Sequence, residues 1–153
     1  MNNAATNILV GIVIAGVSSW ITVQLSLRRF RSEKLWERKV AAYERVIEAL
    51  HHSKAFCAAH MTAEEEGREV AAARDQALRQ RATEADMEIQ KASDVGGFLL
   101  SDEAQARLEQ YAKESKEASN SPDWYGYLEA DFAATDSCLT DLIRIAKKDL
   151  QAR

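Results

Sequence analysis

The sequence predicts an all-α protein in which one N-terminal transmembrane helix is continuous with a cytoplasmic antiparallel bundle of about four helices. Residues 1–27 contain no Asp, Glu, Lys or Arg, whereas all 20 basic and all 24 acidic residues follow Leu27. The polar part is rich in good helix formers, and the whole chain has one proline and six glycines. Apolar residues there recur every three or four positions instead of alternating. We therefore expect residues 1–27 to form a tail and anchor, and residues 28–153 to form one bundle.

The expected anchor runs from Ile8 to Leu27. Twenty helical residues extend about 30 Å, which is the thickness of the hydrocarbon core of a bilayer. A cleaved signal peptide would carry its positive charge before the apolar stretch, but here Arg28 and Arg29 follow it. Because basic residues stay on the cytoplasmic side, we expect the N-terminus outside and the C-terminal domain in the cytoplasm.

Small residues form one stripe on this apolar helix, at Gly11, Ala15, Ser18, Thr22 and Ser26. Their spacings of three and four place them on one face. Small side chains let transmembrane helices approach closely, and hydroxyl groups bond across the contact. The stripe predicts a self-association seam or the wall of a narrow polar pore. The alternative is a lone anchor in which the small residues have no role.

Charge is unevenly distributed after the anchor. Residues 28–45 carry seven basic and three acidic residues, and the remainder carries thirteen and twenty-one. The collar Arg28, Arg29, Arg31 and Lys34 lies where anionic lipid headgroups could bind it. The alternative is that these residues only mark the cytoplasmic side. The acidic remainder argues against general nucleic-acid binding.

Three arginines in the acidic part are nevertheless dense enough to form a small anion pocket: Arg74, Arg79 and Arg81. A solvated helix face is the alternative explanation for them.

Helix signals divide the polar part into four. The first helix follows the anchor without a break and has an apolar seam that ends near Met61. The second runs from about Glu64 to Val95, where Gly96 and Gly97 break it. The third has Ser101 as its N-cap and ends near Ser119. The fourth opens at Ser121-Pro122 and ends at Leu150, and we expect it to form the core pair with the first.

Motifs for chemistry are sparse. Glu48 and His51 make one Glu-x-x-His unit, but the second unit that di-iron bundles need is missing. The two cysteines have neither disulfide nor metal-ligand spacing. With no phosphate loop or nucleophile motif, we expect a non-enzyme without a cofactor or metal. Tyr125 and Tyr127 are candidates for stacking on a ligand or partner, although core packing also explains them.

The run Ser32–His51, SEKLWERKVAAYERVIEALH, resembles a pattern in small bacterial single-pass membrane proteins. The similarity covers 20 of 153 residues, and its matching positions are Trp36, Glu37, Arg38, Lys39, Ala42, Tyr43, Ile47, Glu48, Ala49, Leu50 and His51. Proteins of this build include the Hailong-type anti-phage membrane effectors. That resemblance implies a homo-oligomer of the bacterial inner membrane that opens an ion path. It also implies an oligonucleotide ligand, made by a partner nucleotidyltransferase, that holds the effector inactive.

A second function fits the same architecture. A membrane-anchored helical scaffold or adaptor would use its bundle to recruit a cytoplasmic partner protein. The sequence leaves both functions open.

Overall fold

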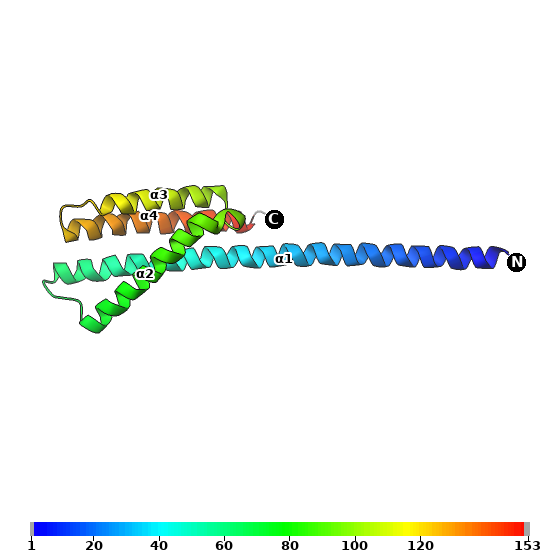
Figure 1. The fold of residues 1–153 in the computed structure, drawn as a ribbon, viewed down its shortest axis with the longest axis horizontal. Helices are drawn as coiled ribbons and strands as arrows, with labels where there is room; N and C mark the ends of the chain where they lie inside the picture. Colours follow the sequence, from blue (N-terminus) through cyan, green and yellow to red (C-terminus); the bar gives the residue numbers. More distant parts are fainter. Residues whose placement is uncertain (1, 152–153) are drawn as a thin grey trace. The chain divides into compact units, whose positions relative to one another are not determined.

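The chain is all-α in the computed structural model, which describes the backbone of residues 2–151 and the side chains of residues 20, 23–27, 29–94 and 97–151. Four α-helices and one short 3-10 helix occur in this range, and it contains no strand (Figure 1). Their bounds are α1 Asn2–Glu65, α2 Ala72–Val95, η1 Gly96–Phe98, α3 Asp102–Ala118 and α4 Trp124–Gln151. The predicted all-α class and its four helices are confirmed.

Two compact units divide the chain, Met1–Glu37 and Arg38–Arg153. The boundary falls inside α1, ten residues later than the expected end of the anchor at Leu27. In the first unit, Lys34 Nζ lies 2.7 Å from Glu37 Oε2 and 5.8 Å from the centroid of the Phe30 ring. No helix within the described residues is long and apolar enough to cross a membrane. The side chains of residues 8–19, which make up most of the expected anchor, lie outside that description.

The second unit has its core between all four helices. α3 and α4 pack side by side as an antiparallel hairpin (Figure 1). The core combines Tyr43 and Leu50 of α1 with Ile89 of α2, Leu108 of α3 and Leu142 of α4. Burial of such side chains stabilises a fold by about 1.5–3 kcal/mol each relative to exposure.

The first helix places its predicted apolar seam only partly in the core. Tyr43, Leu50 and Cys57 are buried, whereas Trp36 is 41% exposed. Lys54 lies between Leu50 and Cys57 on α1, reaches outward and pairs with Asp136 of α4 at 2.5 Å. Its long stem allows an apolar position to carry a charged tip at the surface.

The predicted cap of α3 is confirmed. Ser101 is extended, and its Oγ accepts a hydrogen bond from Ala104 N at 3.3 Å. Asp102 and Glu103 follow in the first turn, where negative charge complements the positive end of the helix dipole. The helix ends at Ala118, with Ser119 as its C-cap.

The expected start of the second helix at Glu64 is wrong. α1 continues through Glu65, and the chain turns at Gly67, whose φ of 63° suits glycine because it has no Cβ. Arg68 N donates to Ala63 O at 2.9 Å and closes the end of α1. Consequently α2 begins only at Ala72, and residues 66–71 form a connection between the two helices.

The expected opening of the fourth helix at Ser121-Pro122 is also displaced. Asp123 caps α4 instead: its Oδ1 accepts from Gly126 N at 2.7 Å, and the helix begins at Trp124. Aspartate and serine are equally good N-caps, so either position could satisfy the first turn.

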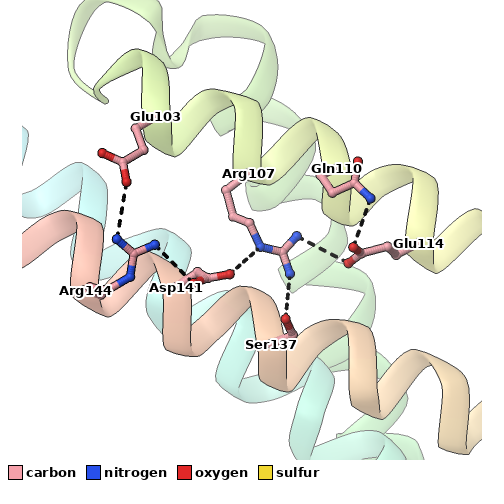
Figure 2. A network of polar contacts seen from close by, with 7 residues as sticks. All are labelled: Glu103, Arg107, Gln110, Glu114, Ser137, Asp141 and Arg144. Atoms are coloured by element: carbon pink, nitrogen blue, oxygen red, sulfur yellow. Dashed lines mark hydrogen bonds and ion pairs between the residues drawn. The ribbon is translucent and has the colours of Figure 1, made fainter.

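Polar side chains connect α3 to α4 along the outside of the hairpin (Figure 2). Arg107 of α3 donates to Asp141 at 3.0 Å and to Ser137 at 3.2 Å, both on α4, and to Glu114 at 3.3 Å. The Arg107 side chain is only 12% exposed, so these contacts satisfy a largely buried guanidinium.

A second polar cluster connects α1, α3 and α4. Asp149 accepts hydrogen bonds from Lys39 at 2.6 Å and from Tyr43 OH at 2.7 Å. Tyr43 OH also lies 3.1 Å from Ser101 Oγ, the cap of α3. One buried tyrosine in the interior of α1 therefore contacts the start of α3 and the last turns of α4.

A candidate anion-binding site

A cavity of about 140 Å³ lies where the end of α1 meets the start of α2. Ala59 and Thr62 of α1 form one wall, and Val70, Ala71 and two arginines, Arg68 and Arg74, complete the lining. The volume is large enough for several water molecules or a small oxyanion. The turn at Gly67 creates this site, because it brings the connection back against the last turns of α1.

The charge of this cavity is one-sided. Among the described residues, the ionisable ones that line it are Arg68 and Arg74, and no carboxylate does. Arg74 has no ion pair among the described residues. Arg68 donates from Nε to Glu66, which leaves its terminal nitrogens for another acceptor. The first turn of α2 adds the positive end of a helix dipole, and its N–H groups at Arg74 and Asp75 donate to Ala71 O at 2.8 and 2.9 Å. Arginine forks are donors that bind phosphate in proteins.

A second cavity, of about 230 Å³, shares Arg68 and Val70 with the first. Its lining is of mixed sign and includes His60, Asp75 and Arg79. His60 is 8% exposed, and its Nε2 lies 3.0 Å from Asp75 Oδ1, yet neither atom makes a hydrogen bond of normal geometry. We interpret His60 and Asp75 as a close contact in which both atoms can still form a hydrogen bond with another group.

Arg79 pairs with the carboxylate of Asp75 in that second cavity. Its Nε donates to Asp75 Oδ2 at 2.8 Å, and this hydrogen bond holds the pKa of the Asp75 carboxyl below its usual range. Arg79 also stands over the Phe56 ring at 5.8 Å. Because its charge is matched by Asp75, Arg79 is less suited than Arg74 to a free anion.

Aromatic rings surround His60 at this end of the second unit. The centroid of its ring lies 4.5 Å from that of Phe56 and 5.8 Å from that of Trp124. Trp124 stacks in turn on Tyr127 at 5.3 Å. These contacts fix the end of α1 against the start of α4.

A polar cluster within the second unit centres on Asp131. Asp131 is 6% exposed, and its carboxylate accepts from Ser115 Oγ at 2.7 Å and from Cys57 Sγ at 3.4 Å. Burial, followed by the nearby charge of Asp131, raises the pKa of Cys57 to about 12. A thiol held neutral in this way is a poor nucleophile.

Metal-ligand geometry is absent from the described residues, where no group of three or more His, Cys, Asp or Glu side chains could hold an ion. Glu48 lies 3.8 Å from His52, its neighbour one turn on.

The structure separates the three arginines of the expected anion pocket. Arg74 lines the first cavity and Arg79 the second, whereas Arg81 is exposed and lines neither. Arg68 and Thr62 were not among the residues selected from the sequence. Gly67 is the feature of the sequence that could have indicated this site, because a turn at that glycine places Arg68 and Arg74 beside the end of α1.

The two tyrosines that were candidates for stacking on a ligand or partner, Tyr125 and Tyr127, have contacts within the chain. Tyr125 OH donates to Glu65 Oε1 at 2.9 Å. Tyr127 is half-buried against Trp124, and burial, with the charge of Asp131, raises its pKa to about 12. The Tyr125 hydroxyl thus joins α4 to Glu65 of α1, and Tyr127 packs against the buried cluster that contains Phe56 and Cys57 of α1.

The remaining predicted site residues belong to the first unit. Ser26, Arg29, Arg31 and Lys34 are exposed. Side chains outside the described residues are those of Gly11, Ala15, Ser18, Thr22 and Arg28.

The cavity lined by Arg68 and Arg74 is thus the best candidate for a ligand site in the described residues. Comparison of the chain with protein-family models, with curated proteins and with solved structures found no match.

Proposed function

We propose that the protein is an oligomeric single-pass membrane effector whose cytoplasmic bundle gates an ion path in response to a phosphate-bearing ligand. One observation carries this proposal. The helix that contains the apolar segment Ile8–Leu27 also contributes Ala59 and Thr62 to the arginine cavity. A ligand in that cavity therefore contacts the same helix, α1, that would form the anchor.

The membrane part of the proposal rests on amino-acid chemistry. Twenty consecutive residues without charge suit a bilayer, and the basic collar Arg28–Lys34 suits its cytoplasmic surface. The small residues Gly11, Ala15, Ser18 and Thr22 would bring anchors of several copies together and leave hydroxyl groups for a polar path. The similarity of Ser32–His51 to bacterial single-pass proteins favours the bacterial inner membrane and a role in anti-phage defence.

The ligand part rests on the arginine cavity. A phosphate group there would bridge Arg68 of the connection and Arg74 of α2, beside the last turns of α1. A ligand shifts a conformational equilibrium only when it binds one arrangement better than the other. The cavity walls come from α1, the connection that follows it and α2. The affinity of the cavity for a ligand therefore depends on how α1 and α2 are arranged.

Induced expression in bacteria tests the gating part. Wild-type protein should be extracted from membranes only by detergent, and its expression should make the inner membrane permeable to a potential-sensitive dye. Replacing Ser18 and Thr22 by leucine should leave the protein in the membrane but abolish the dye response, because leucine closes the polar stripe.

A double variant on another face, Val17→Leu with Ile21→Leu, is the matched control and should behave as wild type. Recovery of the wild-type protein in the aqueous fraction would contradict the anchor. An unchanged dye response in the Ser18 and Thr22 variant would contradict gating and favour the scaffold function.

A further inference from the structure

Phe98 is the most exposed large apolar side chain among the described residues, at 88%. It lies in η1, between α2 and α3. A ring presented to water at the tip of a turn contributes nothing to the core of its own chain. A single exposed apolar side chain is ordinary on a protein surface, so Phe98 indicates a contact surface only together with an apolar receptor nearby.

An apolar cavity of about 130 Å³ lies near this turn. Its floor consists of Ala42 and Val46 of α1, Ala92 of α2, and Leu99 and Leu100, the two residues that follow Phe98. Phe98 itself does not line the cavity. The exposed ring and the apolar hollow are thus adjacent through Leu99 and Leu100.

The charges around these two features are opposite. The rim of the cavity carries Arg45, Glu88 and Lys91. Arg45 has no ion pair among the described residues, and Lys91 is 3.5 Å from Glu88, so the rim has one unmatched positive charge.

Two acidic residues near the Phe98 ring carry the opposite charge. Asp94 and Asp102 stand four residues before and four residues after Phe98, and both are exposed. Within the described part of the chain, neither carboxylate has an ion-pair partner.

We propose that two copies of this chain associate through a reciprocal contact, in which Phe98 of each copy enters the apolar cavity of the other. Asp94 and Asp102 then lie against the Arg45 rim of the partner copy. A two-fold contact of this kind is self-complementary, because the same patch supplies the ring and the receptor on both sides. The inference rests on the oligomer in the proposed function and specifies one of its contacts.

Disulfide trapping tests the contact in membranes that contain the full-length chain. Two differently tagged copies are co-expressed, one with Phe98→Cys and the other with Ala42→Cys. Each copy carries one new thiol, so a disulfide between the two tags can form only across subunits. The native Cys57 and Cys138 are fully buried and are left in place. We expect a heterodimer band under mild oxidation that disappears on reduction.

The matched control pairs Ile143→Cys with Ala42→Cys, because Ile143 is an exposed apolar residue on α4. This pair should give at least about tenfold less heterodimer. The mass of the detergent-solubilised wild type is measured in parallel. An oligomeric wild type with no Phe98–Ala42 band overturns the reciprocal contact alone, whereas a monomeric wild type overturns the oligomer of the proposed function as well.

Discussion

Cys57 and Asp131 meet between α1 and α4, where the Cys57 thiol donates to Asp131 Oδ2 at 3.4 Å. Ser115 of α3 donates to the other carboxylate oxygen at 2.7 Å. A single buried acid therefore connects three helices through two neutral donors. Its value to the fold lies in satisfying those donors, since an unsatisfied buried polar group destabilises a protein by about 1–3 kcal/mol.

Replacing Asp131 by alanine should lower the free energy of unfolding by about 1–3 kcal/mol, because both donors lose their acceptor. Asp131→Asn should cost less, because its amide oxygen can still accept from Ser115. Urea unfolding of the detergent-solubilised protein, followed by circular dichroism, measures both. Asp136→Ala on the same helix breaks only a half-exposed pair with Lys54 and should cost less than about 1 kcal/mol. Equal losses in the Asp131→Ala and Asp136→Ala variants would count against the role of Asp131.

Arg107 should be more important than any other arginine of α3 and α4. Arg107→Ala leaves Asp141, Glu114 and Ser137 without a shared donor, and we expect a loss of about 1–3 kcal/mol. Arg107→Lys should restore little, because a lysine ammonium cannot reproduce the planar fork. Arg144→Ala is the control: the Arg144 side chain is 62% exposed, so its loss should stay below about 1 kcal/mol. Full rescue by lysine would show that charge alone suffices.

Inorganic phosphate and pyrophosphate should stabilise the wild-type protein against heat, because a ligand that binds only the folded state raises its melting temperature. Arg68→Ala and Arg74→Ala should each remove most of this shift, and high salt should weaken it. Arg81→Ala is the matched control, since Arg81 lies on α2 but lines neither cavity. A shift that survives in both cavity variants would place phosphate elsewhere on the protein.

Stability should fall in acid because Asp149 has a lowered pKa. Burial opposes its ionisation, but the hydrogen bonds from Lys39 and Tyr43 and the charge of Lys39 outweigh that effect. The stabilisation is therefore present above the unfolded pKa of about 3.9 and is lost as the pH falls through the lower folded value. Urea midpoints of wild type and Asp149→Asn should differ at pH 7 and converge below about pH 4. A constant difference down to pH 3 would assign the acid response to other carboxylates.

Both cysteines should resist thiol reagents in the folded protein. Burial is the largest cause that raises the pKa of Cys57 and of Cys138 to about 12. At pH 8 their thiolate fraction is then about a thousandfold lower than that of an ordinary cysteine. A chromogenic disulfide reagent should detect two thiols after denaturation and react far more slowly before it. Rapid reaction of one thiol in native protein would indicate local opening of the bundle.

Local chemistry determined the helix ends that the sequence predicted correctly. Ser101 caps α3 as expected, because a cap needs only its own side chain and the next turn. The two displaced starts, of α2 and α4, arose where several residues could each end or cap a helix. In the structure the chain turns at Gly67 after α1, and Asp123 caps α4. Which residue takes each role depends on how the connections pack against neighbouring helices.

By itself the sequence determined the all-α class and the number of helices, because period, helix propensity and helix punctuation act within a few residues. It also fixed the contrast between a charge-free segment and a charged bundle, since that contrast is a matter of composition. Only the tertiary structure decided that Arg68 and Arg74 share a cavity without a carboxylate, and that Asp131 meets Cys57 and Ser115. The cavity depends on how the connection after Gly67 folds back against α1, and the Asp131 contacts join residues distant along the chain, so both exist only after the helices have packed.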